Sequence, residues 1–175
     1  ANLHTTSYAY DELNRLHSVT DPMLQTTTHT YDTNGNRQTT LDANGHTTTY
    51  IYDELNRLTD IDYDDGSSVT YTYDAIGNRL TMVDSLGTTT YTYDDLYRLL
   101  SITSPTGATS YTYDAVNQLT LTTPAGATTY AYDGANRMVS VTDWDNQVTT
   151  YSYDAAGRQT GIAYPNGITT TNTYD

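Results

Sequence analysis

The sequence contains no cysteine, no phenylalanine and no lysine. Without cysteine, disulfide bonds and thiolate metal sites are excluded, and the absence is compatible with either redox compartment. No apolar run approaches the length of a membrane-spanning helix, and no charged segment followed by an apolar one resembles a signal peptide. We therefore expect no insertion into a membrane.

Basic residues are scarce. Seven arginines stand against 21 acidic residues, which gives a formal net charge of -14. Proteins that bind nucleic acid rely on basic residues to displace counterions from phosphates, so nucleic acid and anionic membranes are not expected partners. The charge is spread along the chain, which predicts an acidic surface that favours solubility and opposes association between sheets.

Tyrosine, in contrast, is abundant, with 19 residues, and much of it recurs in Tyr-Asp pairs 19 to 21 residues apart. We call their members the motif Tyr and the motif Asp. A fixed period of this length is typical of repeat architectures, in which each unit packs on its neighbours. The pairs are Tyr10-Asp11, Tyr31-Asp32, Tyr52-Asp53, Tyr73-Asp74, Tyr93-Asp94, Tyr113-Asp114, Tyr132-Asp133, Tyr153-Asp154 and Tyr174-Asp175.

Three further features keep the same phase. A second Tyr stands two residues before the motif Tyr in seven of the nine copies, with His29 and Asn172 as the exceptions. A turn signature such as Asp64-Asp65-Gly66 lies midway between pairs. An arginine follows the motif Asp by four or five residues, and Gln118 replaces it once. These arginines are Arg15, Arg37, Arg57, Arg79, Arg98, Arg137 and Arg158.

This combination resembles the YD repeat of the RHS (rearrangement hot spot) family, whose pattern is Tyr-x-Tyr-Asp-x-x-[Gly/Asn]-Arg-Leu followed by a turn and a Thr-rich strand. The match covers nearly the whole chain. The resemblance implies a spiral of β-hairpins that in relatives forms a hollow shell around a toxin domain or lies on a cell surface. Relatives also carry a core-associated segment and a variable C-terminal domain. Neither is recognisable in these residues, so the resemblance does not support a toxin activity for this chain.

The residues themselves predict an all-β fold, because Thr, Tyr, Val and Ile favour strands and each period holds two turn signals. One strand of a repeat covers residues such as 79–83, and the other residues such as 69–73. Alternation along the second strand puts Val69, Tyr71 and Tyr73 on one face and the two threonines between them on the other. We predict a tandem array of β-hairpins that coils into a spiral, shell or tube wall.

The other strand leaves two alternatives open. Pairs such as Leu58 with Ile61 are three residues apart, which places them on opposite faces of a regular strand. Either a β-bulge realigns them or both faces are partly covered.

The turn after each motif Asp has a clear mechanism. The Asp side chain accepts backbone N–H groups, and a residue suited to the left-handed conformation closes the turn. The Gly35-Asn36 and Gly77-Asn78 pairs are interpreted as one-residue insertions, and each Arg is expected to lie along a neighbouring Tyr or to pair with a motif Asp. The left-handed residues are predicted to be Asn14, Asn56, Gly77, Asn117, Asn136 and Gly157.

The chain opens and closes in Thr/Tyr strands, residues 5–10 and 169–174, and Ala1 in place of Met indicates a processed or excised chain. Exposed strand edges recruit further strands. We expect residues 1–175 to form a single array of about eight repeats within a longer chain or assembly. Flanking YD repeats or further copies of this chain are the expected partners at these edges.

Few residues are candidates for a ligand site. Asp60, Asp62, Asp64 and Asp65 form the densest carboxylate cluster, a weak calcium candidate, with an acidic turn as the alternative. Trp144 lies between two aspartates and is a candidate for glycan contact, or for packing on its own hairpin. His4, His17, His29 and His46 fit no metal motif, and His29 takes the place of a packed Tyr. No cofactor and no catalytic set are predicted.

We expect a non-catalytic structural protein, secreted or on the cell surface. As a scaffold it would enclose cargo or assemble into a filament or tube. The alternative is a cell-surface adhesin module that binds glycans through exposed Tyr and Trp side chains.

Overall fold

The computed structural model describes residues 5–175, and its regular elements are 17 β-strands. No helix in this part of the chain is long and apolar enough to cross a membrane. The prediction of an all-β fold built from hairpins is confirmed. The strands are β1 (Ser7–Tyr10), β2 (Leu16–Thr20), β3 (Thr26–Tyr31), β4 (Arg37–Leu41), β5 (Thr47–Tyr52), β6 (Leu58–Tyr63), β7 (Ser68–Tyr73), β8 (Arg79–Asp84), β9 (Gly87–Tyr93), β10 (Leu99–Ser104), β11 (Gly107–Tyr113), β12 (Gln118–Thr123), β13 (Gly126–Tyr132), β14 (Met138–Thr142), β15 (Val148–Tyr153), β16 (Gln159–Ala163) and β17 (Thr169–Thr171).

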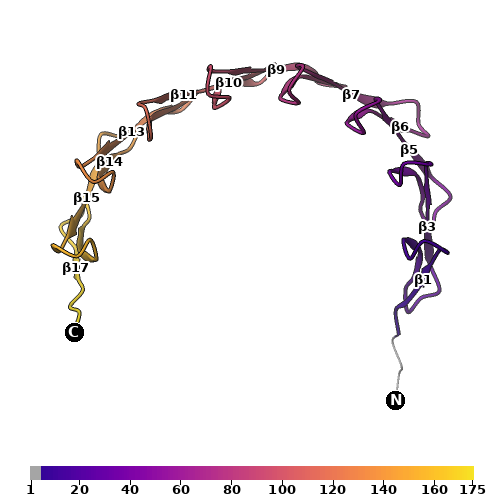
Figure 1. The fold of residues 1–175 in the computed structure, drawn as a ribbon, viewed down its shortest axis with the longest axis horizontal. Helices are drawn as coiled ribbons and strands as arrows, with labels where there is room; N and C mark the ends of the chain where they lie inside the picture. Colours follow the sequence, from indigo (N-terminus) through magenta and orange to yellow (C-terminus); the bar gives the residue numbers. More distant parts are fainter. Residues whose placement is uncertain (1–4) are drawn as a thin grey trace. The chain divides into compact units, whose positions relative to one another are not determined.

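The chain forms two compact units, with the boundary between Thr89 and Thr90, inside β9. In the first unit β1 to β8 form an antiparallel meander in which each strand pairs with the next. In the second unit β9 to β17 do the same. Figure 1 shows the strands of each unit side by side in chain order. A single array through both units stays a prediction.

Each sheet has two distinct faces. On β7, Val69, Tyr71 and Tyr73 are half-buried, whereas Thr72 on the opposite side is exposed. We call the side of the motif Tyr the Tyr face and the opposite side the Thr face. On the Thr face, hydroxyl groups of paired strands bond to each other, as in Thr72–Thr81 at 2.6 Å and Thr112–Thr120 at 2.8 Å. The predicted division of the strand is confirmed.

A β-bulge decides between the two alternatives for the other strand of the repeat. Tyr52 pairs with Leu58 and Ile51 pairs with Asp60, so Thr59 is an extra residue. Beyond the bulge, Ile61 pairs with Tyr50, and Leu58 and Ile61 therefore share the Tyr face. The same shift in register occurs in every other hairpin that follows this pattern, namely β1–β2, β3–β4, β7–β8, β9–β10, β11–β12, β13–β14 and β15–β16.

The turn after the motif Asp shows that the interpretation of inserted residues was wrong. Asp53 N–H donates to the carbonyl of Arg57, and Asp32 N–H donates to the carbonyl of Asn36, so both turns have the same length. Asn36 therefore takes the place of Arg57, and Arg37 takes the strand position of Leu58 opposite a motif Tyr. Asn78 and Arg79 repeat this exchange.

The left-handed position of this turn is largely as predicted. Positive φ angles are found at Asn14, Asn56, Gly77, Asn136 and Gly157, and also at Gly35 and Tyr97. The prediction for Asn117 was wrong. Its turn is one residue shorter, because Asp114 N–H donates to the carbonyl of Asn117 itself, and no residue of this turn has a positive φ.

The mid-repeat turns account for the rest of the variation in period. In most of them three residues separate the two that are hydrogen-bonded, as where Asp21 N–H donates to the carbonyl of Gln25. In the second unit, Ser104 pairs directly with Gly107, and Thr123 with Gly126, which leaves two-residue loops. These loops and the shorter turn at Asp114 produce the period of 20 residues after Tyr93 and the period of 19 after Tyr113. The period of 20 residues after Tyr73 contains the equally short connection between Asp84, the last residue of β8, and Gly87, the first of β9.

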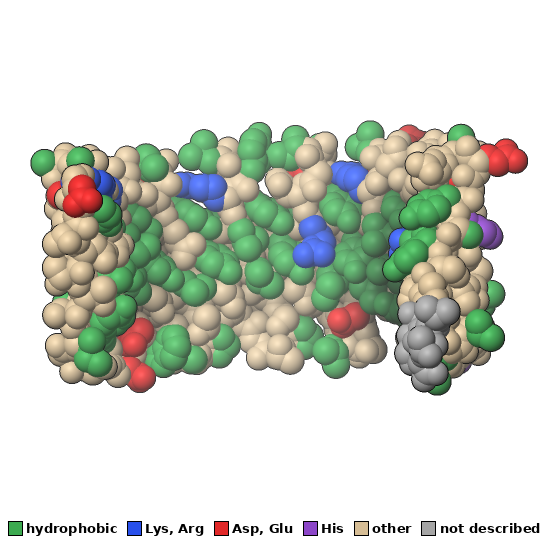
Figure 2. Space-filling model, turned by 90° about the horizontal axis from the view of Figure 1, so that it is seen from below, with side chains coloured by type: hydrophobic (Ala, Val, Ile, Leu, Met, Phe, Trp, Pro, Cys, Tyr) green, Lys and Arg blue, Asp and Glu red, His purple; other side chains and the backbone are tan. Residues whose placement is uncertain are grey.

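Neither unit has a conventional core. Of residues 5–175, no hydrophobic side chain is fully buried, and the least exposed residues are His29 and Thr89, each 8% exposed. Figure 2 shows hydrophobic side chains gathered over the face of the strands in view, with arginines mostly at one rim. The packing expected of His29 is confirmed by its burial and by its contact with the Thr40 hydroxyl, 3.1 Å from Nδ1. The Tyr face is thus one apolar layer without a second layer over it.

Candidate functional site

The motif Asp organises its own turn and fixes the arginine. In the third copy, Asp53 Oδ1 accepts the N–H groups of Leu55 and Arg57 at 2.9 and 3.0 Å, and Oδ2 accepts Arg57 Nε at 2.7 Å. Because these donors favour the charged carboxylate, with the Arg57 backbone N–H the strongest, the pKa of Asp53 lies below its ordinary value. The same Asp–Arg ion pair is made by Asp11–Arg15, Asp94–Arg98, Asp133–Arg137 and Asp154–Arg158.

The arginine then reaches the following repeat. The Arg57 guanidinium carbon lies 4.9 Å from the centre of the Tyr73 ring, and Nη1 donates to the carbonyl of Asp74 at 2.8 Å. The Tyr73 hydroxyl in turn donates to the Leu58 carbonyl at 2.7 Å. We call this set of contacts, from a motif Asp through its Arg to the next motif Tyr, the clasp. It recurs with ring distances of 4.4 to 4.7 Å at Arg15–Tyr31, Arg98–Tyr113, Arg137–Tyr153 and Arg158–Tyr174.

The sequence left open whether an arginine lies along a neighbouring Tyr or pairs with a motif Asp, and in the clasp it does both. The five arginines of the clasps pair with the Asp of their own repeat and cover the Tyr of the next: Arg15, Arg57, Arg98, Arg137 and Arg158. The side chains of Arg57 and Asp53 are 26% and 24% exposed, so the ion pair is partly screened. A cation–π contact of this kind contributes on the order of 0.5–2 kcal/mol. The main effect of the clasp is to fix the geometry between consecutive repeats.

Three copies depart from this scheme. Asn36 and Asn78 take the place of the arginine and bond to the motif Asp of their turns, at 3.0 and 2.9 Å. In the remaining copy, Asn117 takes this place and donates to Asp114 Oδ2 at 3.4 Å, so the prediction that Gln118 replaces the arginine was wrong. Gln118 is the first residue of β12 and pairs with Tyr113, and a groove of about 250 Å³ opens between Gln118, Met138 and Tyr132. Burial raises the pKa of the Tyr132 hydroxyl. The sequence contained the signal for Asn36 and Asn78, since both stand four residues after the motif Asp.

The four clustered aspartates are separated by the strand and its turn. Asp60 and Asp62 lie on the Thr face of β6, opposite Ile51 and Thr49, whereas Asp64 and Asp65 lie in the turn that follows. Asp64 pairs with Nδ1 of His46 at 2.6 Å, and Asp65 accepts the Ser67 N–H and hydroxyl. Within residues 5–175 no three acidic or histidine side chains gather as a metal ion would require. Calcium binding stays a prediction from the sequence alone.

The histidines have separate environments. His46 is exposed, and its bond to Asp64 raises its pKa. His17 Nδ1 lies 3.2 Å from the His29 carbonyl, and burial lowers the pKa of the His29 ring. His4 lies outside the described residues.

Trp144 lies in the turn between β14 and β15 and is 58% exposed. Its Cβ lies against the neighbouring hairpin, since a Cβ added at Gly126 would come 2.7 Å from the Trp144 Cβ. Its turn is closed by the Asp145 N–H, which donates to Oδ1 of Asp143 at 3.0 Å. The exposed part of the ring is available for contact with a ligand.

Comparison with known families decides the identity of the repeat. The RHS Repeat family model matches seven overlapping segments, residues 10–47, 31–68, 52–89, 73–109, 98–128, 113–148 and 145–170. The chain belongs to the RHS repeat family. The resemblance predicted from the motif Tyr, Asp and Arg positions is therefore confirmed. A search among curated proteins found no match.

Several solved structures share the fold. A crystal structure of TcdB2-TccC3 without its hypervariable C-terminal region matches with a TM-score of 0.73 and 20% identity, over 96% of this chain and 12% of that one. TcdB2-TccC3-TEV matches with a TM-score of 0.54, 17% identity and 91% coverage of this chain. The Photorhabdus luminescens Tc holotoxin pore matches with a TM-score of 0.51, 17% identity and 92% coverage of this chain. Each of these last two matches covers 13% of the matched chain. This RHS chain thus spans about one eighth of the length of these proteins.

Proposed function

We propose that this RHS chain is a non-catalytic structural element, a stretch of wall in a secreted or cell-surface protein. The observation that carries the proposal is the clasp, which ties one repeat to the next at five places along residues 11–174. In a chain built this way, the polar contacts of the clasp connect one repeat to the next. Its membership of the RHS family and the fold shared with Tc toxin structures support the same role.

The uncovered Tyr face gives this wall an inner side. Its apolar side chains are half-buried, as at Val69, Tyr71 and Tyr73 of β7, so in a monomer in water they are left partly solvated. We propose that the Tyr face lies towards enclosed cargo, such as a toxin domain, and that the hydroxyl-rich Thr face lies towards water.

Flanking RHS repeats are the proposed neighbours at the two outer strands. Among the described residues β1 pairs with β2 and β17 pairs with β16, which leaves one edge of each free for main-chain hydrogen bonds. Further RHS repeats, in the same chain or in another copy, complete these edges, and residues 1–175 form a single array.

The experiment is to measure mass in solution by light scattering, with negative-stain electron microscopy of the same sample. We expect a mass above 19.4 kDa that increases with concentration, as filaments or tubes grow through strand pairing. Thr169→Pro removes a backbone donor from the free edge of β17 and is expected to reduce the mass. Asn172 N–H donates to the Thr160 carbonyl, so the alternate residues Thr170 and Asn172 face β16 and Thr169 faces outward. Thr106→Pro in an exposed loop serves as control. A monomer at every concentration would overturn edge pairing, and hydrolytic activity in the purified chain would overturn the non-catalytic assignment.

The second candidate function is glycan binding through Trp144, favoured by the exposure of its ring beside Asp143 and Asp145. Exposed tryptophan in a turn offers a flat apolar surface on which a sugar ring stacks. A glycan array comparing the chain with its Trp144→Ala variant tests it. Absence of binding, or binding that the substitution leaves unchanged, counts against this site.

A further inference from the structure

The Thr face of β15, β16 and β17 contains a groove. Its volume is about 470 Å³, and it is lined by Thr150, Ser152, Thr160, Gly161, Ala163, Thr169 and Thr171, together with three residues of the opposite face. The strand register explains its form. Gly161 lies between Ser152 and Thr171, and Ala163 lies between Thr150 and Thr169. Two small residues on β16 therefore form a floor between hydroxyl-bearing walls on β15 and β17.

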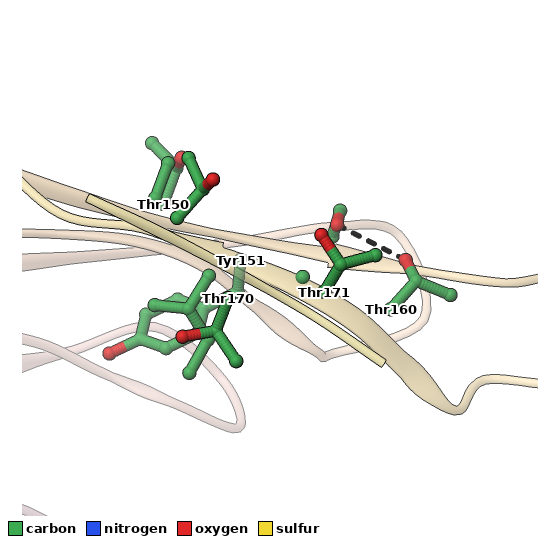
Figure 3. A pocket seen from close by; sticks show the side chains of 10 residues that line it. Thr150, Tyr151, Thr160, Thr170 and Thr171 are labelled. Atoms are coloured by element: carbon green, nitrogen blue, oxygen red, sulfur yellow. Dashed lines mark hydrogen bonds between the residues drawn. The ribbon is translucent and has the colours of Figure 1, made fainter. Parts of the chain in front are cut away.

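Figure 3 shows these side chains in place. Thr150, Thr160 and Thr171 lie on one side of the ribbon, and Tyr151 and Thr170 lie on the other. The dashed line marks the bond of 3.1 Å between the hydroxyls of Ser152 and Thr160, on the same side as Thr171. The polar lining thus belongs to the Thr face, separate from the Tyr face that the wall function uses.

Gly161 is the residue that opens the groove. Its φ is not positive, so the backbone conformation at this position does not require glycine. A Cβ there would stand 2.8 Å from the Ser152 Oγ and 3.3 Å from the Thr170 carbonyl oxygen. The corresponding position of every other repeat carries a polar residue with a side chain: Ser18, Thr39, Asp60, Thr81, Ser101, Thr120 and Ser140.

The chemistry of the lining selects a class of ligand. None of the ten lining residues is charged, although the chain as a whole carries a net charge of -14. Each Ser or Thr hydroxyl donates one hydrogen bond and accepts up to two, so the walls suit a ligand with mixed donors and acceptors. The Ala163 methyl, the Gly161 Cα and the threonine methyls add apolar surface. Ions gain nothing here, whereas a neutral molecule with hydroxyl groups and C–H faces matches both parts of the lining.

We propose that this groove binds a neutral saccharide, with the sugar chain lying along β16 between the walls. The walls are two strand spacings apart, roughly 10 Å, which leaves room for one chain of sugar rings. The volume falls within the range of roughly 300–1,000 Å³ typical of small-molecule sites. Because the groove is open to solvent on one side, binding is weak for a single site and increases through repetition on a polymeric ligand.

The test uses the complete chain and neutral linear tetrasaccharides of β-1,4-linked glucose or N-acetylglucosamine, added up to millimolar concentration. In two-dimensional NMR spectra we expect saturable shifts of the Gly161, Ile162 and Thr170 amide signals. Gly161→Thr restores the side chain found in other repeats and is expected to weaken binding by about tenfold or more. Ser140→Thr, at the matched position of the preceding repeat, is the control and is expected to leave binding unchanged.

A second variant guards against a folding defect in Gly161→Thr. Thr171→Val keeps the shape of the wall and removes one hydroxyl, so a loss of about three- to tenfold is expected if that hydroxyl contacts the sugar. Two outcomes would overturn the proposal. The first is an absence of shifts near Gly161 with either sugar. The second is binding that both groove variants leave intact but Trp144→Ala removes, which would assign the sugar to the turn instead. Neither outcome bears on the wall function, which edge pairing tests separately.

Discussion

The guanidinium of Arg57 covers the ring of Tyr73, one repeat further along the chain, while its Nε remains bonded to Asp53 in its own repeat. One side chain thereby joins an acid, an aromatic ring and a main-chain carbonyl from two consecutive units. Planar geometry makes this possible, because guanidinium donates in its plane and stacks through its face at the same time. Lysine cannot do both, and the chain contains none.

Arg57→Ala is expected to lower the free energy of unfolding by about 1–2 kcal/mol, since it removes the stacking and leaves Asp53 unpaired. Arg57→Lys retains the charge and is expected to recover less than half of that loss. Urea unfolding followed by circular dichroism measures both. Arg158, which is 46% exposed, is the matched comparison, and Arg158→Ala is expected to cost about 0.5 kcal/mol. Equal losses at Arg57 and Arg158 would show that burial of the clasp does not matter.

Acid is expected to loosen the repeats only at low pH. The Arg57 backbone N–H and side chain hold the pKa of Asp53 below its ordinary 3.8, so the charged form contributes stability above that value. This contribution is lost as the pH falls through the lowered pKa. Thermal unfolding between pH 7 and 2 should therefore show a nearly constant midpoint down to about pH 4, then a decrease. Asp53→Asn should lower the midpoint at pH 7 and flatten the acid limb, and an unchanged acid limb would contradict the assignment.

His46 and Asp64 give the opposite dependence. The Asp64 carboxylate 2.6 Å from Nδ1 raises the pKa of His46 above 6.5. The stability from this pair is therefore complete below pH 6.5 and is lost as the pH rises through the raised pKa. An NMR titration of the His46 ring measures the shift directly. Asp64→Asn is expected to return the pKa towards 6.5, whereas Asp62→Asn on the adjoining strand is the control and should have a smaller effect.

Tyr97 occupies the left-handed position of its turn with a φ of 62°, where six other copies have Asn or Gly, namely Asn14, Gly35, Asn56, Gly77, Asn136 and Gly157. A residue with a large side chain loses stability in this region, and Tyr97 is 62% exposed, so little packing compensates. Tyr97→Asn is expected to stabilise the chain by about 0.5–1 kcal/mol in urea unfolding. The reciprocal change, Asn56→Tyr, should destabilise it by a similar amount. A loss of stability in Tyr97→Asn would show that the ring makes a contact worth more than the strain.

Gly126 allows Trp144 to approach the preceding hairpin. An added Cβ would come 2.7 Å from the Trp144 Cβ, at a φ of 141°. Gly126→Ala is expected to cost about 2–3 kcal/mol, from both backbone strain and the clash. Gly134→Ala is the control, since a Cβ there meets nothing within 4 Å and the φ is not positive. The double variant Gly126→Ala, Trp144→Gly removes the Cβ that the added methyl group meets, and it should recover only the part of the loss due to the clash, as a double-mutant cycle measures.

The sequence was sufficient for the repeat, the two strands of each period and the face on which Tyr71 and Tyr73 lie. These follow from periodicity alone, because alternation along a strand assigns every side chain to a face. The bulge was only one of two alternatives, since Leu58 and Ile61 share a face only when Thr59 is left unpaired. That choice depends on the partner strand, which no local pattern specifies.

The clasp was predictable in its members but not in its connections. Arg57 was expected near a Tyr or an Asp, yet its reach into the next repeat depends on the distance between neighbouring hairpins. The exchange at Asn36 and Arg37 was misinterpreted because spacing from Asp to Arg was counted, rather than the position four residues after the Asp. The groove at Gly161 was missed for a similar reason, since its walls come from three strands.

The clasp also bears on how such chains change over evolutionary time. Because it connects only consecutive units, the loss or duplication of one unit by recombination between similar coding segments creates no contact of a new kind. A conventional core would have to be rebuilt after such an event, but these residues bury no hydrophobic side chain completely. The number of repeats can therefore change by whole units, and natural selection can act on that number.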